Sequence, residues 1–257
     1  MADESAIACR LCGSQSRAAF SAELLLRHQV QYQHCPACDY LQTETPYWLD
    51  EAYERPITLQ DTGVLQRNLM LSKTLALTLF VNGLREGPFL DYAGGYGIMT
   101  RLMRDSGFDY YCYDPHTQNL FADGFEATPD RSFEAISAFE VLEHLADPVA
   151  QIGELLEQTD TLVLSTELRP SPIPATSWPY YGFEHGQHIG FFSTASLEFL
   201  AHRLGINLLT DERFVHVLTR SAGFEFPAPR GLRARRVLRR IRKTMTSLTH
   251  SDVPRRL

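Results

Sequence analysis

Residues 89–97 read Phe-Leu-Asp-Tyr-Ala-Gly-Gly-Tyr-Gly, and this stretch decides the fold class. Its apolar start predicts a strand, its glycines predict a tight turn, and residues 98–104 predict a helix. A strand, a glycine-rich loop and a helix N-terminus form the unit with which α/β proteins hold a nucleotide-like ligand against backbone N–H groups. Glycines between a strand and a helix are also common in plain turns, so a ligand site needs support from elsewhere in the chain.

The next predicted strand gives that support. It covers residues 109–114 and ends in Asp114, 17 residues beyond Gly97. An acid at this offset lies beside the glycine loop, where its carboxylate can accept both ribose hydroxyls of a bound nucleoside. Strands and helices then alternate with short connections, which predicts a doubly wound, mostly parallel sheet. These later elements are strands at 133–139 and 161–165 and a helix at 148–158.

Residues 166–192 form a long segment rich in proline and aromatic residues. It follows a strand at the edge of the sheet where α/β proteins bind ligands, and loops of this length inside a domain are usually functional. The remaining pattern predicts a helix over 62–84 that ends at Gly83, a helix over 196–204, and a terminal antiparallel hairpin of residues 206–209 and 214–218.

Four cysteines near the N-terminus form two Cys-x-x-Cys pairs separated by 22 residues: Cys9, Cys12, Cys35 and Cys38. This spacing is typical of a zinc ribbon, because each turn brings two thiolates to one ion. Two disulfides are the alternative, which a reducing cytosol disfavours. Four thiolates leave no open coordination position, so we expect Zn²⁺ to be structural. Cys112 lies in a predicted strand and is expected in the core.

The composition, 44% hydrophobic and 21% charged, is that of a soluble globular protein. The first residues are acidic without an apolar run, and no stretch approaches the ~18 apolar residues of a spanning helix. We therefore expect a cytoplasmic protein.

The net charge of −7 conceals a basic tail on an acidic body. From Arg230 onward there are ten basic residues and one acid, Asp252, which leaves 14 basic and 30 acidic residues elsewhere. Apolar residues of the tail fall on one helical face: Ala234, Val237, Leu238, Ile241, Met245 and Leu248. Such a helix predicts either peripheral contact with the inner face of an anionic membrane or docking on the acidic body.

In this order, the features of residues 60–220 resemble the class I S-adenosylmethionine-dependent methyltransferases. The resemblance implies a Rossmann-like, seven-stranded sheet closed by the hairpin. The family's loop has three alternating glycines, and Ala93 stands in place of the first, which is tolerable if its φ is negative. The implied S-adenosylmethionine contacts are Asp91, Ala93, Gly94, Gly95, Gly97, Asp114, Pro115 and Phe139.

With the cysteine pairs in front, the chain is similar to the sugar methyltransferases of bacterial saccharide biosynthesis. Their loop contains a His-Glu-His-Leu-Ser-Tyr-like run, which corresponds here to residues 186–191, Gly-Gln-His-Ile-Gly-Phe. The family's catalytic histidine therefore falls on His188. Gln187 replaces the neighbouring glutamate, and the large C-terminal domain of the sugar C-methyltransferases is absent, so both departures favour a hydroxyl over a carbon acceptor.

A hydroxyl nucleophile must lose its proton as the bond to the methyl group forms, and histidine suits that task near neutral pH. We predict His188 as the general base, although a histidine at this position can also tie the loop backbone together. His144 is a second polar contact or an alternate base. Glu184, His185 and Gln187 are predicted to hydrogen-bond the substrate. The function expected is O-methylation of a sugar, nucleotide-linked or in a polysaccharide.

Three alternatives remain open. An RNA methyltransferase would suit the zinc ribbon and the basic tail, but the acidic body argues against nucleic acid. A sugar C-methyltransferase and a non-catalytic adaptor with a degenerate S-adenosylmethionine fold are the others. The predicted domains are the zinc ribbon (1–45), a helical linker or lid (46–86), the cofactor-binding core (87–222) and the basic amphipathic tail (223–257).

Overall fold

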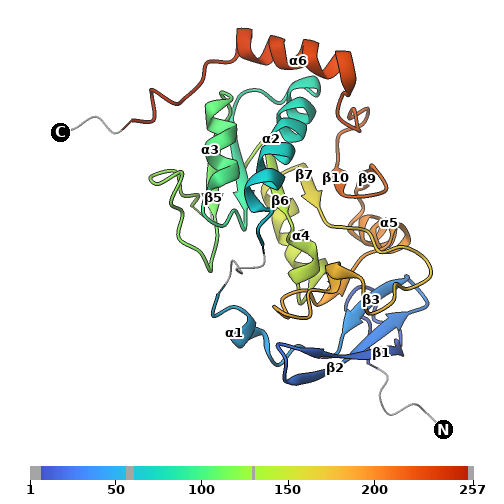
Figure 1. Ribbon diagram of the computed structural model, residues 1–257. Coiled ribbons are helices and arrows are strands. Elements are labelled where there is room, and N and C mark those ends of the chain that lie inside the picture. The colour runs from blue at the N-terminus through green and yellow to red at the C-terminus, as the bar shows by residue number, and fades with distance from the viewer. Residues whose placement is uncertain (1–6, 56–60, 129–130, 254–257) are drawn as a thin grey trace. The chain divides into compact units, whose positions relative to one another are not determined.

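The computed structural model describes residues 7–55, 61–128 and 131–253, so residues 56–60 of the predicted linker and Arg255 and Arg256 of the tail lie outside it (Figure 1). The chain divides into two compact units. We call residues 1–58, 140–154 and 164–218 the ribbon unit, and residues 59–139, 155–163 and 219–257 the glycine-loop unit. These boundaries differ from the four predicted segments, because the N-terminal region forms one unit with later parts of the chain.

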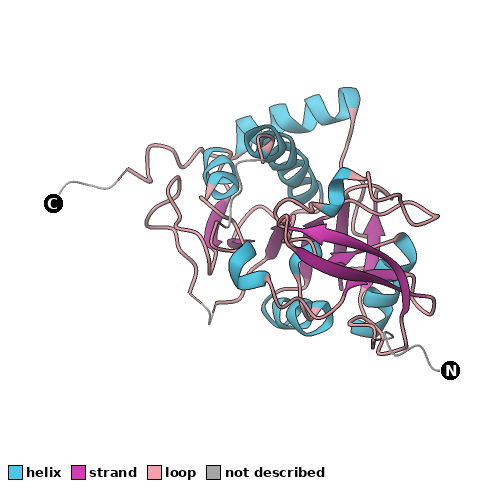
Figure 2. Ribbon diagram, turned by 60° about the horizontal axis from the view of Figure 1, so that its bottom comes forward, coloured by secondary structure: helices cyan, strands magenta, loops and turns pink. Residues whose placement is uncertain are grey.

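The ribbon unit contains a four-stranded sheet in the order β1-β2-β3-β8. Figure 2 shows the strands of the protein in magenta. Its strands are β1 (Arg17–Leu24), β2 (His28–Cys35), β3 (Tyr40–Thr43) and β8 (Gly190–Phe191). The pairs are antiparallel, with Cys35 opposite Tyr40 and Leu41 opposite Phe191. The last strand comes from the long segment 166–192, so the sheet joins the N-terminal cysteine region to the segment that contains His188.

Aromatic side chains fill the core of the ribbon unit. Tyr32, Tyr181 and Phe191 are fully buried, and their ring centroids lie 5.1 to 5.9 Å apart. Trp48 packs in the same cluster, and its indole N–H donates to the carbonyl of Gly186 at 2.8 Å. These contacts hold residues 48 and 186 together across 138 positions of sequence.

Short helices complete the ribbon unit. They are α1 (Leu49–Ala52), two 3₁₀ turns, η1 (Leu142–His144) and η2 (Pro179–Tyr181), and α5 (Thr194–Leu204). The sequence explains both ends of α5. The hydroxyls of Ser193 and Ser196 form a reciprocal capping box at its start, and Gly205, with a left-handed φ of 64°, ends it.

The larger sheet has six strands in the order β5-β4-β6-β7-β10-β9. Strand β4 is parallel to both β5 and β6, and Asp91 lies opposite Cys112 on one side and Ser137 on the other. The predicted α/β class with parallel pairing is confirmed. The strands are β4 (Pro88–Tyr92), β5 (Asp109–Tyr113), β6 (Ala135–Phe139), β7 (Thr161–Ser165), β9 (Asn207–Thr210) and β10 (Val215–Thr219).

The predicted seventh strand is not found among the described residues. A single parallel bridge pairs Cys112 with Glu126 beside β5, and Ala127 donates its N–H to the carbonyl of Cys112 at 2.8 Å. The sequence then reaches Pro129, which has no N–H with which to extend a ladder. Strands β9 and β10 are neighbours in the sheet, and their antiparallel pairing stays a prediction.

The glycine-loop unit carries α2 (Val64–Val81), α3 (Ile98–Asp105) and α6 (Gly231–Thr244), whereas α4 (Pro148–Gln158) has residues in both units. The predicted helix over 62–84 is therefore confirmed as α2. Helix α6 contacts α2, and Figure 1 shows the two side by side. Ile241 of α6 is buried at 3% exposure.

The tail is anchored to its own unit by more than this helix contact. Beyond α6, the carboxylate of Asp252 accepts two hydrogen bonds from Arg104 of α3, at 2.7 and 2.8 Å, and lies 2.9 Å from Arg101. These contacts join the one acid of the tail to arginines of α3, so they hold the end of the tail on its own unit. Peripheral membrane contact of the basic face stays a prediction. Within the described residues, no helix combines the length and apolar character needed to cross a bilayer.

Replacing Ile241 by Ala should lower the free energy of unfolding by about 2 kcal/mol or more, because it removes buried methyl groups from the contact of α6. Chemical denaturation measures the change. Leu232→Ala on the same helix is the control, since this side chain is 71% exposed and should change stability by less than about 0.5 kcal/mol. Equal effects of the two substitutions would contradict the docked position of α6.

Candidate active site and metal centre

The glycine loop, residues 93–97, connects β4 to α3 as predicted. Gly95 and Gly97 have φ values of 56° and 78°, in the left-handed region that glycine adopts at little cost. Gly94 is required for space, because a Cβ atom there would lie 2.5 Å from Oδ2 of Asp91 and 2.9 Å from Sγ of Cys112. The loop therefore brings its main chain closer to β4 and β5 than any larger residue would allow.

Ala93 does not meet the condition set in the sequence analysis. Its φ is 54°, not negative, so the alanine adopts the left-handed conformation that its methyl group disfavours. This strain costs about 1 kcal/mol relative to glycine.

Asp114 lies beside the glycine loop, as its offset predicted. Its Oδ2 accepts the N–H of Gly95 at 2.9 Å, and its Oδ1 accepts the N–H groups of His116 and Thr117 at 2.8 and 2.7 Å. The carboxylate thus joins the end of β5 to the loop. A cavity of about 280 Å³ opens next to it, lined by Cys112, Asp114, Thr117, Gln118, Asn119, Asp123 and Glu126.

The other predicted cofactor residues occupy ends of neighbouring strands. Pro115 is exposed directly after β5, and Phe139 is half-buried at the end of β6. Asp91 is only 3% exposed and accepts hydrogen bonds from the hydroxyls of Ser137 at 3.1 Å and Thr100 at 3.5 Å. Burial raises the pKa of Asp91 to about 7, and the negative charge of Asp114 adds to the shift.

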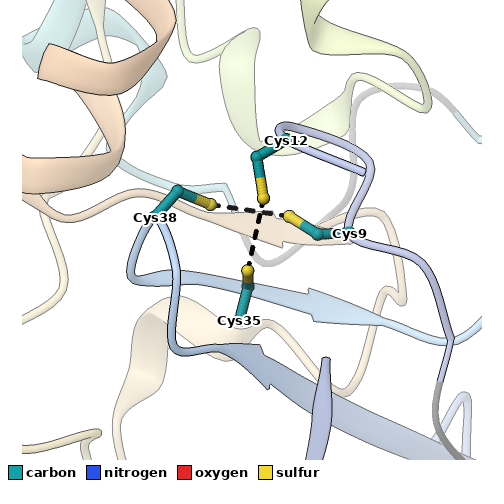
Figure 3. A group of neighbouring side chains, drawn as sticks. All are labelled: Cys9, Cys12, Cys35 and Cys38. Carbon is teal, nitrogen blue, oxygen red and sulfur yellow. Dashed lines mark hydrogen bonds between the residues drawn. The ribbon is translucent and has the colours of Figure 1, made fainter. Parts of the chain in front are cut away.

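The four cysteines of the ribbon unit point their sulfur atoms toward one another (Figure 3). Cys9 and Cys38 are 3.6 Å apart at Sγ, and Cys12 and Cys35 are 3.4 Å apart. Tetrahedral zinc with Zn–S bonds of about 2.3 Å requires sulfur separations of about 3.8 Å. The sulfur positions are therefore close to those of a four-thiolate zinc site.

The turns that carry these cysteines also fit thiolate ligands. Gly13 donates its N–H to the carbonyl of Cys9, and Asp39 donates to the carbonyl of Cys35, both at 2.8 Å, so each Cys-x-x-Cys pair closes the same kind of turn. Gly13 and Asp39 have φ values of 79° and 59°. Inside the first turn, the N–H of Leu11 points to Sγ of Cys9 at 3.4 Å. Backbone N–H groups of this kind stabilise negative charge on sulfur.

Arg10, inside the first cysteine turn, connects the cysteine cluster to the His188 segment. Its main-chain N–H donates to Oε1 of Gln42 at 2.8 Å, and its guanidinium donates to the carbonyls of Thr43 and Ile189. The N–H of Thr43 donates to the same Ile189 carbonyl at 3.0 Å, and the N–H of Ile189 donates to the carbonyl of Glu143 at 2.8 Å. Both polar groups of the Ile189 main chain are thus bound.

His188 and His144 come together, with ring centroids 4.9 Å apart. Nδ1 of His188 lies 2.6 Å from the carbonyl oxygen of Tyr180. A carbonyl only accepts, so this hydrogen bond places the proton on Nδ1 and leaves Nε2 as the basic nitrogen. Nδ1 of His144 lies 3.1 Å from the carbonyl of Gln187 and 3.0 Å from the hydroxyl of Tyr53.

Glu143 and Tyr180 belong to the same cluster, and our sequence analysis did not select them. Glu143 is fully buried, and Tyr180 donates its hydroxyl to Oε1 of Glu143 at 2.8 Å. Burial raises the pKa of Glu143 to about 8, with a further contribution from Glu140, and burial lowers the pKa of His144 to about 4. The available signal was the position of Glu143 directly before His144, in the segment Glu-Val-Leu-Glu-His-Leu of residues 140–145.

The predicted substrate contacts have different surroundings. Glu184 is exposed, and His185 lies against His188 with ring centroids 4.8 Å apart. Gln187 is buried, and its side-chain amide donates to the carbonyls of Ala52 at 2.9 Å and Arg55 at 3.2 Å. These bonds give Gln187 a structural role that holds the end of α1, and its predicted contact with substrate stays a prediction.

Comparison with protein families assigns the class. The model of a family described as methyltransferase domain matches residues 66–211, which is more than half of the chain. The chain therefore belongs to this methyltransferase family. The predicted enzyme class, S-adenosylmethionine-dependent methyltransferase, is confirmed by this match.

The solved structures to which this chain is similar include several methyltransferases. Magnesium protoporphyrin IX methyltransferase from Synechocystis PCC 6803 is 15% identical, with 68% of this chain and 95% of that chain covered and a TM-score of 0.45. The glycopeptide N-methyltransferase MtfA is 14% identical over 59% of this chain and 90% of that chain, with a TM-score of 0.43.

A third structure is CalO1, a methyltransferase of calicheamicin biosynthesis, which is 13% identical over 59% of this chain, with a TM-score of 0.42. Our chain spans 54% of the length of CalO1. A search of the curated proteins finds no match to this sequence.

Asp91 gives a pH-dependent test of the glycine-loop unit. Its carboxyl has a pKa of about 7 when folded and an ordinary value of 3.8, so the unfolded chain is already ionised at pH 5 while the folded protein is not. Raising the pH from 5 to 8 should therefore cost the wild type about 2.6 kcal/mol of unfolding free energy relative to Asp91→Asn, because the folded carboxyl stays protonated over most of this range. Denaturant titrations at both pH values measure this difference.

Asp123→Asn is the control for this measurement, because Asp123 is exposed and should leave the pH dependence of the wild type in place. If Asp91→Asn and the wild type lose stability equally between pH 5 and 8, the carboxyl of Asp91 is not held in its protonated form.

Proposed function

We propose that the protein transfers the methyl group of S-adenosylmethionine to a hydroxyl of a sugar unit, nucleotide-linked or part of a polysaccharide, with His188 as general base. The observation that carries this proposal is the hydrogen bond from Nδ1 of His188 to the carbonyl of Tyr180. It fixes the tautomer whose Nε2 can accept a proton.

Residues of the glycine-loop unit would hold the cofactor. The loop 93–97 leads into the N-terminus of α3. Three backbone N–H groups occupy three of the roughly four lone-pair sites of the Asp114 carboxylate, and the remaining site on Oδ2 can accept a hydroxyl of the cofactor. When bound, S-adenosylmethionine supplies a methyl group on a positively charged sulfur. A nucleophile can attack the methyl carbon, and the sulfur then leaves as a neutral thioether. The hydroxyls of Ser137 and Thr100 keep Asp91 in place beneath the loop.

The ribbon unit would supply the acid–base chemistry. His188 accepts the proton of the acceptor hydroxyl as the oxygen attacks, which raises the nucleophilicity of the oxygen. Burial lowers the pKa of His144 to about 4, so its ring is neutral near pH 7. It can therefore contact the acceptor as an uncharged hydrogen-bonding group. The hydroxyl of Tyr53 lies 3.0 Å from Nδ1 of His144 and is a further polar group beside this ring.

We propose a structural Zn²⁺ at Cys9, Cys12, Cys35 and Cys38. The sulfur separations and the repeated turn geometry support this ion, and four protein ligands leave no position for a substrate. Its role would be to fix the turn that carries Arg10, and through Arg10 the carbonyl of Ile189 next to His188.

The surroundings of Gln187 favour an oxygen over a carbon acceptor. The related C-methyltransferases have a glutamate at this position, whereas the amide of Gln187 donates two hydrogen bonds to backbone carbonyls. A carboxylate would face those two carbonyl oxygens without a proton to donate. RNA methylation is the second candidate, and the exposed arginines of α6 are the observation in its favour.

His188→Ala should reduce methyl transfer to the sugar acceptor by about 100-fold or more, because general-base catalysis contributes that much. Binding of S-adenosylmethionine, measured by calorimetry, should be unchanged. Gly94→Ala, in contrast, should lose binding of S-adenosylmethionine, since its Cβ would displace the Asp91 side chain.

Gly153→Ala is the control for the glycine substitution, because a Cβ there would meet only Leu204 at 3.9 Å. Unchanged turnover of His188→Ala on the true acceptor would remove the base assignment. Failure of the wild type to bind S-adenosylmethionine would favour the adaptor alternative, and RNA binding that weakens steeply with salt would favour the RNA alternative.

Zinc content tests the cysteine site separately. The purified protein should retain one zinc per chain in a chelator such as EDTA, and Cys12→Ala should lose it, whereas Cys112→Ala, outside the cluster, should keep it. Loss of zinc should also speed hydrogen exchange at residues 186–191, because Arg10 would no longer hold Ile189. Slow exchange in the zinc-free protein would contradict the proposed link.

A further inference from the structure

A second group of possible metal ligands lies in the ribbon unit. One ligand atom each from Glu143, His144 and His188 lies within 4.8 Å of the others. None of the three belongs to the cysteine cluster. Two imidazoles and one carboxylate form a donor set that divalent transition metals prefer, whereas Mg²⁺ and Ca²⁺ prefer oxygen donors.

The two histidines are oriented as metal ligands usually are. Nδ1 of His188 faces the carbonyl of Tyr180 at 2.6 Å, and Nδ1 of His144 faces the carbonyl of Gln187 at 3.1 Å. Histidine ligands commonly donate one ring N–H to a backbone carbonyl, which fixes the ring and leaves the other nitrogen unprotonated for the metal. The same pattern occurs here twice, on residues that come from two separate segments of the chain.

Glu143 provides an independent sign of a missing partner. Its side chain is fully buried, and Tyr180 binds Oε1. Its other oxygen, Oε2, has no hydrogen-bond partner among the described residues. A buried carboxylate oxygen without a partner is costly, and few occur in native proteins without a ligand, water or ion to satisfy them.

We propose that Glu143, His144 and His188 bind one divalent transition-metal ion, of the kind represented by Zn²⁺ or Co²⁺, at a site separate from the four cysteines. Three protein ligands leave coordination positions for water or a ligand oxygen. His185 is a neighbour of this site and not one of its ligands, because its Nδ1 accepts the N–H of Gln187 at 3.1 Å.

This site has a consequence for catalysis, which rests on the proposed function. A lone pair of His188 that binds a metal ion cannot accept a proton from a hydroxyl at the same time. Metal binding and general-base catalysis therefore exclude each other, and a transition-metal ion at this site inhibits methyl transfer.

Cobalt is the probe for the test, added to full-length protein whose cysteine site retains zinc. We expect a saturable visible absorption of weak d–d bands at one Co²⁺ per chain. Glu143→Gln and His144→Asn should each weaken Co²⁺ binding by about tenfold or more. Glu198→Gln and His202→Asn, exposed residues on α5, are the matched controls and should bind Co²⁺ as the wild type does.

No saturable Co²⁺ binding, or equal binding by both cluster variants and the wild type, overturns the proposal. Intense near-ultraviolet thiolate bands would place the ion at the cysteines and also overturn it. Thermal melts and retained zinc show whether the variants are folded. If Glu143→Gln does not fold, His144→Asn provides the test.

Methyl transfer is measured first in EDTA and then, after the EDTA is removed, with added Co²⁺. This comparison tests the proposed methyl transfer separately from the proposed metal site. Inhibition at the Co²⁺ concentration that saturates the absorption supports the inference that His188 cannot bind the metal and act as a base at once. Activation by Co²⁺ overturns that inference. Absence of activity in EDTA counts against the proposed function and leaves the metal measurement unaffected.

Discussion

The main chain of Ile189 is the point at which three parts of the ribbon unit are joined. Its N–H donates to the carbonyl of Glu143, and its carbonyl accepts from the N–H of Thr43 and from the guanidinium of Arg10. Arg10 belongs to the first cysteine turn, Thr43 ends β3, and His188 directly precedes Ile189. Because buried backbone groups must be satisfied, the position of His188 depends on hydrogen bonds to distant parts of the chain, including one from Arg10, 179 positions before Ile189.

Burial is the second constraint, and at both candidate sites it favours the uncharged form of the titratable side chains. Asp91 and Glu143 are carboxyl groups that burial keeps protonated toward neutral pH, and His144 is an imidazole that burial keeps neutral. Each is held by hydroxyls or carbonyls instead of by an opposite charge. Neutral groups with fixed hydrogen bonds are suited to proton transfer, since no existing ion pair has to break.

The local sequence pattern was sufficient to predict elements that depend on residues close together in the sequence. The strand, the glycine loop and the helix of residues 88–105 follow from apolar periodicity and from glycine, and the offset of Asp114 predicted its contact with the loop. The pattern failed at Ala93, where a positive φ is imposed by the loop path and not by the residue itself. The predicted count of seven strands is not reached among the described residues, where a single parallel bridge pairs Cys112 with Glu126 beside β5.

The sequence by itself determined the α/β class, the cysteine pairs, the glycine loop and His188 as a candidate base. Only the tertiary structure decided that β8 completes the sheet of the cysteine region, that Glu143 and Tyr180 join His144 and His188, and that Gln187 serves the backbone. The physical reason is range. Periodicity and turn chemistry act within a few residues, whereas hydrogen bonds and burial at the Ile189 junction involve residues that only folding brings together.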